Sequence, residues 1–518
     1  MHRSLFVALL LVPAPALALS TSASWTYEGS QDTENLGMAV ASIGDVNGDG
    51  FGDFAGAAPQ WDGDAQDMGR VVVFYGSATG PGEGPDWTAS GRVEDALFGT
   101  SVAGAGDVNG DGYDDLIVGA QGDDPGSGPV GGAFLYLGSA AGLQSTPAWT
   151  GAGGADLDRF GASVAGVGDL DGDGLDDVAV GAFRFTDVQV RQGRAFVFRG
   201  QGGGLEEEAS WTFEGTDPGE NLGATVAGAG DVNDDGFDDL LVAAPGYSDD
   251  WYANSGRVHL FHGSASGPGA DPDWTVAPEW AQASFGYSMA AVGDVNGDGY
   301  DDVVIGSAPE DIFDRTGDRV FLYFGAANGL ARDEAWSGLY SDYPHHHIAV
   351  AAPGDVDGDG RPDLLVGREV LYLDQHGDAF LYSGGADGFG DPTWHVTPEK
   401  ASMLFGSAVA GGDIDGDGLG DLIVGARGFN GDHLNAGRLL LYPADESLAG
   451  DDDDAADDDD AGDDDDAFGD DDDDGFNAEV FGDGGGELEG GACVSSLAPG
   501  QLAPGLLLLL PLAVRRRR

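Results

Sequence analysis

The stretch "GDVNGDGYDDLIVGA" at residues 106–120 crowds oxygen-bearing side chains into a short loop and then turns apolar. Counted from Asp107 as position 1, Asp or Asn occupies positions 1, 3, 5 and 9. Calcium prefers about six to eight oxygen ligands, which alternate side chains and one backbone carbonyl, here that of Tyr113, can supply. In a single copy this pattern fits a calcium loop and a solvated acidic turn equally well, because such turns are common without metal.

The same pattern begins seven times along the chain, which decides between these two interpretations. The starts are Asp45, Asp107, Asp169, Asp231, Asp294, Asp355 and Asp413, separated by 62, 62, 62, 63, 61 and 58 residues. Positions 1, 3, 5 and 9 are Asp or Asn in every copy. A solvated turn has no reason to preserve these positions while the intervening residues vary, so the repetition predicts up to seven Ca²⁺ sites.

Each predicted site uses four side chains and the backbone carbonyl of position 7. The expected ligands are Asp45, Asn47, Asp49, Phe51 and Asp53; Asp107, Asn109, Asp111, Tyr113 and Asp115; Asp169, Asp171, Asp173, Leu175 and Asp177; Asp231, Asn233, Asp235, Phe237 and Asp239; Asp294, Asn296, Asp298, Tyr300 and Asp302; Asp355, Asp357, Asp359, Arg361 and Asp363; and Asp413, Asp415, Asp417, Leu419 and Asp421. An EF-hand would place a bidentate Glu at position 12, where this chain has Gly, Val or Ile, so the EF-hand alternative is rejected.

The charge of the chain excludes one class of function. The formal net charge is -71 over 518 residues, and Lys400 is the single lysine. Without a basic face to neutralise phosphates, nucleic-acid binding is not expected. Much of the acidity has two sources, the 24 carboxylates among the loop ligands and the 21 acidic residues of 451–489.

Each repeat carries four short apolar segments that read as strands. In the second repeat these are residues 98–107, 115–120, 132–138 and 147–151, separated by Gly and Asp turn signals. Stretches with helical periodicity are missing. Four strands repeated seven times predict an all-β fold, a seven-bladed β-propeller over residues 24–443.

The tryptophans predict how the ring closes. Trp25, Trp87, Trp149, Trp211, Trp274, Trp336 and Trp394 each lie 19 or 20 residues before a loop, and none follows the last loop. The seventh blade is therefore one strand short, and the strand "SWTYEG" (24–29) is spare. We expect this N-terminal strand to complete the last blade, which removes exposed sheet edges and favours a monomer.

The motif "FGxSVAxxGDxNGDGxxDLxVGA" resembles the FG-GAP repeat of integrin α-subunit propellers, most fully at 98–120, 160–182, 285–308 and 405–426. The resemblance implies a seven-bladed propeller with calcium in a hairpin loop between the first two strands of a blade. Departures are local: Leu36-Gly37 and Leu222-Gly223 replace Phe-Gly, and Asp234 replaces a loop glycine. The sixth repeat departs most, with His346-His347 in place of Phe-Gly and Arg361-Pro362 inside its loop.

The N-terminus predicts export. Residues 1–18 combine Arg3, an apolar run and a small-residue cleavage site ending at Ala18, which is the pattern of a secretory signal peptide. The single cysteine, Cys493, rules out an intramolecular disulfide, so stability outside the cell has to come from packing and metal.

The C-terminal part predicts a stalk followed by a processing or anchor segment. Residues 444–489 are Asp-rich, and their self-repulsion predicts an extended, disordered linker. Residues 490–518 place Cys493 before an apolar stretch and four arginines, an order similar to myxobacterial Cys-containing C-terminal sorting signals. The apolar stretch from Leu502 is short for a membrane span, which needs about 20 residues. Cleavage near Cys493 and retention of the stretch as a marginal membrane anchor both remain open.

The sequence shows no catalytic set. The histidines at 345–347 are one alternative metal site, although consecutive side chains of a strand alternate between its faces.

We expect a calcium-binding surface propeller that acts as a binding or adhesion module, with an extracellular protein or glycan as ligand. A structural surface component without a ligand and a polysaccharide-acting enzyme are the alternatives. Contacts are expected from the variable loops 58–70, 244–257 and 308–319, where Trp61, Trp251 and Tyr252 are either ligand contacts or ordinary loop residues that pack locally.

Overall fold

The computed structural model describes residues 19–126, 128–154, 158–249, 251–308, 318–339, 346–370, 377–398 and 404–444. The predicted signal peptide (1–18), the Asp-rich linker from residue 445 onward and the segment 490–518 with Cys493 lie outside these residues. So does His345 of the histidine cluster. Regular secondary structure in the described part is entirely β, and no helix there is long and apolar enough to cross a membrane.

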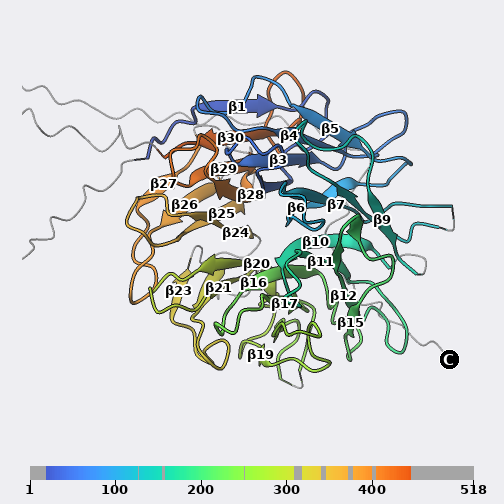
Figure 1. Cartoon of the computed structure of the whole chain (residues 1–518), viewed down its shortest axis with the longest axis vertical. Helices are drawn as coiled ribbons and strands as arrows, with labels where there is room; N and C mark the ends of the chain where they lie inside the picture. Colours follow the sequence, from blue (N-terminus) through green and yellow to red (C-terminus); the bar gives the residue numbers. More distant parts are fainter. Residues whose placement is uncertain are drawn as a thin grey trace, which may run out of the picture. The chain divides into compact units, whose positions relative to one another are not determined.

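Seven four-stranded antiparallel sheets surround a common axis, as Figure 1 shows. The first strands, nearest the axis, are β2 (Ala39–Gly44), β6 (Phe98–Gly106), β10 (Phe160–Gly168), β16 (Thr225–Gly230), β20 (Phe285–Gly293), β24 (His346–Gly354) and β28 (Phe405–Gly412). The second strands are β3 (Asp53–Ala58), β7 (Asp115–Ala120), β11 (Asp177–Ala182), β17 (Asp239–Ala243), β21 (Asp302–Ser307), β25 (Asp363–Val370) and β29 (Asp421–Ala426). The seven-bladed propeller predicted from the repeats is therefore confirmed.

The outer half of each blade consists of the third and fourth strands. The third strands are β4 (Arg70–Phe74), β8 (Gly132–Tyr136), β12 (Arg194–Phe198), β18 (Val258–Phe261), β22 (Arg319–Tyr323), β26 (Asp378–Tyr382) and β30 (Arg438–Tyr442). The fourth strands are β5 (Trp87–Ser90), β9 (Trp149–Ala152), β15 (Trp211–Glu214), β19 (Trp274–Val276), β23 (Trp336–Leu339), β27 (Trp394–Val396) and β1 (Trp25–Glu28). A short ribbon of β13 (Gly200–Gln201) and β14 (Gly204–Leu205) interrupts the third blade.

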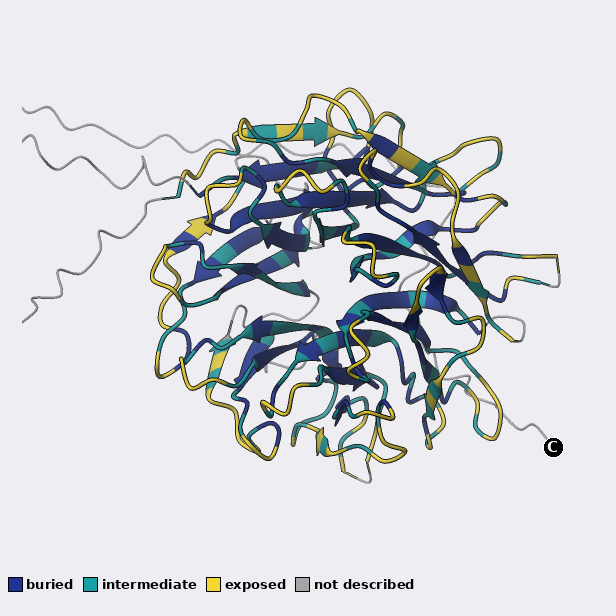
Figure 2. Cartoon of the chain, in the orientation of Figure 1, coloured by how far each residue is buried: buried dark blue, intermediate teal, exposed yellow. Residues whose placement is uncertain are grey.

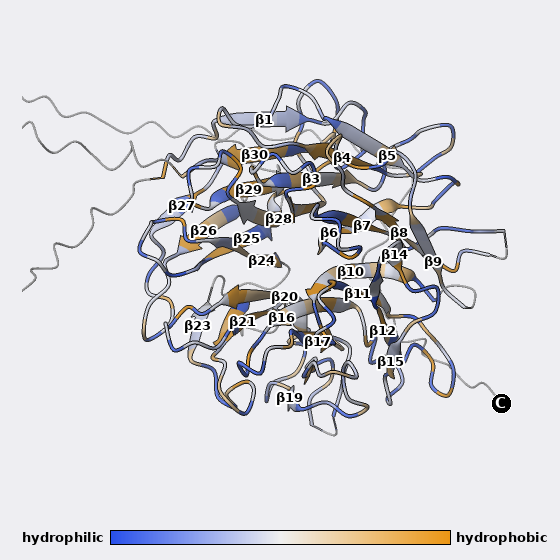
Figure 3. Cartoon of the chain, viewed as in Figure 1, coloured by the Kyte–Doolittle hydropathy of each residue, from blue (hydrophilic) through white to orange (hydrophobic). Residues whose placement is uncertain are grey.

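The hydrophobic core lies between the blades rather than within one of them. One apolar cluster joins Val71 and Val73 of the first blade to Leu116 and Val118 of the second, and equivalent clusters fill every junction of the ring. Both faces of the second strands are therefore covered, which explains their continuous apolar runs and full burial (Figures 2 and 3). Polar residues collect in the connecting loops (Figure 3).

The Phe-Gly pair that opens a blade docks that blade onto the preceding one. Phe98 is buried, and Gly99 has a positive φ of 87°. A Cβ at Gly99 would lie 2.8 Å from the Cβ of Ala57 in the first blade, so a larger residue would push the two blades apart. Leu36 and Leu222, which replace the phenylalanine, are equally buried and bridge to Gly437 and Gly193 of the preceding blades.

The N-terminal strand closes the ring, as the tryptophan spacing predicts. β1 pairs antiparallel with β30, with Trp25 opposite Leu441 and Glu28 opposite Arg438. Trp25 also packs edge-on against Phe74, and its indole Nε1 donates to the carbonyl of Gly82 at 2.8 Å. The last blade is thus built from both ends of the propeller and is attached to the first blade.

Candidate metal centres

All seven predicted loops connect the first and second strands of a blade, so they lie on the same side of the ring. Each loop is folded by the carboxylate at position 1. In the second loop, Oδ1 of Asp107 accepts from the amides of Gly110 and Asp111 at 2.8 and 3.0 Å, and Oδ2 accepts from Gly112 at 2.8 Å. The contact from the position 6 amide recurs in all seven loops at 2.7–3.0 Å. Position 1 therefore forms a tight turn that gathers the other ligands.

Positions 5 and 7 are linked in every loop. The Oδ1 of Asp111 accepts from the amide of Tyr113 at 3.2 Å, and the other six loops repeat this contact at 2.9–3.2 Å. Because this bond uses the amide of position 7, it leaves the carbonyl of the same residue available. The identity of the side chain at position 7 is then unimportant for a backbone ligand, which explains why Phe, Tyr, Leu and Arg all occur there.

Position 9 is a buried carboxylate that fastens the loop to the blade. Asp115 accepts from Val108 through Oδ2 at 3.2 Å and from Gly138, at the end of the third strand, through Oδ1 at 2.8 Å. The position 9 aspartates of the other blades accept two amides in the same way. Burial raises the pKa of Asp115 to about 7, an effect that a nearby cation would oppose. Oδ1, which accepts from Gly138 alone, keeps a lone pair for such a cation.

Two observations test whether the loops fit a calcium ion. Carboxylate oxygens of three residues lie within 4.8 Å of one another in the third, sixth and seventh loops: Asp169, Asp171 and Asp173; Asp355, Asp357 and Asp363; Asp413, Asp415 and Asp417. In the fourth loop, Oδ1 of Asn233 is buried and accepts no hydrogen bond. A buried oxygen without a donor costs free energy unless something else satisfies it. An all-oxygen donor set with an orphaned acceptor suits a hard divalent cation.

The sixth loop keeps this arrangement despite its Arg361-Pro362 sequence. Oδ1 and Oδ2 of Asp355 accept from Gly358 and Gly360 at 2.8 and 2.7 Å. The guanidinium of Arg361 does not fold back on its own loop but donates to the carbonyl of Val295 in the fifth blade at 2.8 Å. The sixth blade itself, β24 to β27, is also complete.

A second set of carboxylates, at position 8, was not identified from the sequence. Oδ2 of Asp114 accepts from the amide of Asp45 in the preceding blade at 2.8 Å, and three further junctions repeat this contact at 2.8–2.9 Å. The residues are Asp114, Asp176, Asp238 and Asp301. Burial raises the pKa of all four. The doubled Asp-Asp at positions 8 and 9 of these four loops was the available signal for this role.

The described variable loops between the second and third strands lie on the other side of the ring, and their aromatic residues differ in exposure. Residues 309–317 of the predicted contact loop 308–319 lie outside the described residues. Trp251 is 86% exposed, on a turn in which Oδ1 of Asp249 accepts from its amide at 2.7 Å. Trp61 is half-buried, and the guanidinium of Arg70 lies 5.3 Å from the centroid of its ring. Trp61 thus packs locally and is only partly exposed, as is Tyr252, whereas Trp251 is free to meet a ligand.

Of the histidine cluster at 345–347, only the side chain of His347 belongs to the described part of the structure. Nδ1 of His347 lies 3.5 Å from Oε2 of the buried Glu369, which also binds Arg427. No group of potential metal ligands found among the described residues includes His347.

Comparison with known proteins agrees with this architecture. The family model "FG-GAP repeat" matches residues 36–74, 98–136, 160–198, 222–261, 285–323 and 405–442, which are the blades other than the sixth. The chain is therefore an FG-GAP repeat β-propeller of the integrin α type.

Its relatives include integrin α subunits from several animals. The chain is 32% identical over 250 residues to integrin alpha-5 of Xenopus laevis, covering 46% of this chain and 22% of that protein. It is 34% identical over 226 residues to integrin alpha-V of Gallus gallus, covering 42% and 20%. It is 36% identical over 165 residues to integrin alpha-PS2 of Drosophila melanogaster, covering 29% and 12%. The chain thus spans about a fifth or less of the length of these curated relatives.

Proposed function

We propose that the protein is an exported, calcium-binding propeller that acts as a binding or adhesion module at the cell surface. The observation that carries calcium binding is the recurrence of one loop geometry in seven blades, with side-chain oxygens at positions 1, 3, 5 and 9 and a carbonyl at position 7. The similarity to integrin α subunits supports a binding or adhesion role by analogy.

Calcium would be held by the carboxylates and amide oxygens of these loops and would bring a divalent positive charge to them. The chain's own residues prepare the loops, since position 1 sets the turn and position 9 ties it to the third strand. Metal analysis of the secreted propeller after dialysis in millimolar calcium should return about seven ions per chain. A result of zero to two ions per chain would contradict the proposal of seven sites.

We propose that the ligand-binding surface is formed by the variable loops on the side of the ring opposite to the calcium loops. The exposed Trp251 is the candidate contact, because large aromatic side chains contribute strongly to recognition of sugars and proteins. A glycan and whole-cell binding array with the purified propeller, with and without calcium, tests this function. Trp251→Ser should weaken the signal at least tenfold. The matched control is Gln144→Ser, which alters an exposed residue between the third and fourth strands of the second blade, on the calcium side of the ring, and should leave the signal unchanged.

The array separates the proposed function from a structural component, and a product-release assay with acidic polysaccharides tests the enzyme alternative. Absence of binding to every cell and glycan would favour a structural surface component. Release of cleavage products from acidic polysaccharides would favour the enzyme.

We further propose that residues 1–18 are removed on export, that the acidic linker 444–489 holds the propeller away from the cell, and that residues 490–518 direct processing or anchoring. Intact-protein mass spectrometry should find a chain that begins near Leu19 and ends close to Cys493. Cys493→Ala should leave a form that still bears the four C-terminal arginines. If the wild-type protein retains these arginines, the tail acts as an anchor and not as a sorting signal.

A further inference from the structure

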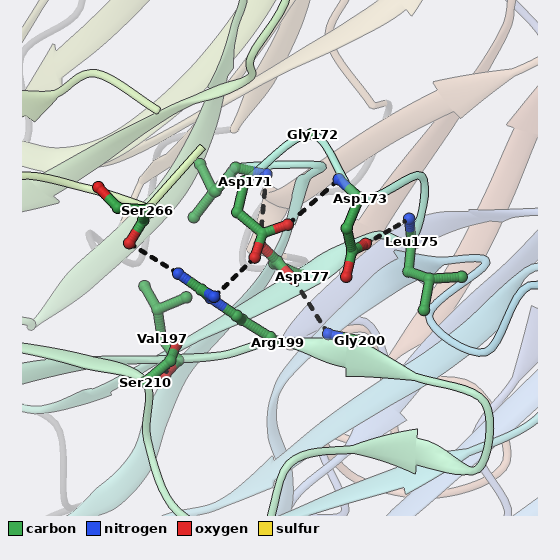
Figure 4. A network of polar contacts seen from close by, with 12 residues as sticks. Asp171, Gly172, Asp173, Leu175, Asp177, Val197, Arg199, Gly200, Ser210 and Ser266 are labelled. Carbon is green, nitrogen blue, oxygen red and sulfur yellow. Dashed lines mark hydrogen bonds and ion pairs between the residues drawn. The ribbon is translucent and has the colours of Figure 1, made fainter. Parts of the chain in front are cut away.

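One predicted calcium ligand is already bound to a cation that belongs to the chain. Nη1 of Arg199 lies 2.8 Å from Oδ2 of Asp171, the position 3 ligand of the third loop (Figure 4). The other terminal nitrogen, Nη2, donates to the carbonyl of Ser266 in the fourth blade at 2.7 Å. The side chains of Arg199 and Asp171 are only 27% and 8% exposed, so water screens this pair incompletely.

The contact with Ser266 has counterparts in other blades, but the contact with Asp171 needs a separate explanation. The residue directly after the third strand commonly reaches the next blade: Oη of Tyr75, for example, accepts from the amide of Leu143 at 3.0 Å. In the other six blades this residue is Tyr75, Leu137, His262, Phe324, Ser383 or Pro443. Contact between blades therefore does not require a guanidinium.

The charge of the third loop gives the explanation. Position 3 is Asn in the first, second, fourth and fifth loops and Asp in the third, sixth and seventh, which therefore carry four ligand carboxylates instead of three. The number of charged ligands is one of the factors that tune calcium affinity. Arg199 cancels the additional carboxylate in the third loop.

We infer that Arg199 is a built-in competitor for calcium that lowers the affinity of the third site below that of the seventh. This inference rests on the proposed calcium binding. The seventh loop is a close comparison, because both loops have Asp at positions 1, 3, 5 and 9 and Leu at position 7, whereas Pro443 stands where the third blade has Arg199. Calcium that binds Asp171 has to displace or repel the guanidinium. The contact with Ser266 keeps that guanidinium within reach.

Hydrogen exchange with mass spectrometry on the full chain, at graded free calcium, can test each loop separately. Peptides that cover residues 107–115, 169–177 and 413–421 report the second, third and seventh loops. We expect the third loop to become protected at about tenfold higher calcium than the seventh, because the ligand sets match and only the third carries an internal cation. Arg199→Gln should move the third midpoint to lower calcium, whereas Arg199→Lys should leave it nearly unchanged.

Two further variants provide controls. Tyr75→Phe removes a contact between blades without changing the charge, and it should leave the third midpoint in place. Asp171→Asn reproduces the position 3 residue of four other loops, and Arg199→Gln should have no effect on the midpoint in that background. The inference is overturned if Arg199→Gln leaves the third midpoint unchanged or moves it to higher calcium. If calcium protects neither the second, the third nor the seventh loop from hydrogen exchange, the proposed calcium binding is overturned together with this inference.

Discussion

Single residues of a loop have separable roles in metal binding and in folding. Asp111 is exposed and bonds only within its loop in the described structure, whereas Asp115 is buried and accepts amides from two parts of the blade. We predict that Asp115→Ala lowers the free energy of unfolding by about 2–4 kcal/mol even with a chelator present, because two buried amides lose their acceptor. Asp111→Ala should destabilise the protein only when calcium is present. Denaturant unfolding with and without chelator checks both predictions. If the two variants lose the same free energy of unfolding under both conditions, the separate roles are contradicted.

His259 is a buried histidine in a position that other blades fill with apolar residues. Its side chain is 4% exposed, Nδ1 lies 2.9 Å from Oγ1 of Thr275, and Nε2 has no hydrogen-bond partner. Burial lowers the pKa of His259 to about 3, with a smaller contribution from Arg257. Below the ordinary value of about 6.5 the unfolded chain binds a proton that the folded chain refuses, so stability falls as the pH falls from that value toward 3.

We predict that His259→Phe removes this sensitivity to acid. Phe occupies the same place in four other blades, for example Phe134 and Phe196, so the substitution should be tolerated. Between pH 8 and pH 5 the wild type should lose about 2 kcal/mol relative to the variant, as expected for about 1.5 pH units below the unfolded pKa. Thermal unfolding of both proteins across this range measures the difference. A difference that stays constant with pH would show that His259 takes up a proton as readily in the folded as in the unfolded chain.

At the scale of the elements, the junctions between blades differ in their polar contacts. Position 8 is Asp where the second to fifth blades meet the preceding blade, but Pro362, Gly420 and Gly52 stand there in the sixth, seventh and first blades. We predict that Asp176→Gly costs about 1–2 kcal/mol, because the partly buried amide of Asp107 loses a charged acceptor. Asp176→Asn keeps an acceptor and should cost less. Chemical unfolding in chelator, which removes any metal contribution, measures the free energy of unfolding of the wild type and both variants. Equal values for the two variants would argue against the hydrogen bond.

The strand β1 is the element that joins the ends of the ring. Its Trp25 and Tyr27 pack against Phe74, and Glu28 forms an ion pair with Arg438. We predict that deletion of residues 24–29 costs more than about 3 kcal/mol, the usual loss for a single packed aromatic side chain. The whole ring should aggregate or lose cooperative melting, because β30 becomes an exposed edge. Calorimetry and light scattering test this; melting like that of the intact protein would show that closure does not depend on β1.

At the scale of the whole molecule, the seven loops concentrate negative charge on one side of the ring. Each loop holds three to five carboxylates within nine residues. A ligand that binds only the folded state stabilises it by about 2.7 kcal/mol at a concentration one hundred times its dissociation constant. We predict that chelation lowers the melting temperature by more than about 10 °C, summed over several sites. Scanning calorimetry before and after chelation, with calcium added back as the control, measures this shift. A shift of less than 2 °C would contradict a stabilising role for the loops.

The sequence by itself determined the architecture, because the information is local and repeated. Loop spacing, alternating strand segments and the tryptophan count specified the number of blades and the closing strand. Each of these signals lies in residues that are close together along the chain. Because the signals repeat with a period of about 62 residues, they can be recognised from the sequence alone.

Only the tertiary structure decided which groups from different blades meet. The contacts of Asp114 with Asp45, of Arg361 with Val295 and of Arg199 with Ser266 join residues more than 60 positions apart. The packing of Trp61 against its own blade, in contrast to the exposure of Trp251, also depends on how each loop folds. Residue types alone cannot specify such pairings, because the direction of a side chain is set by the neighbouring blade against which it packs.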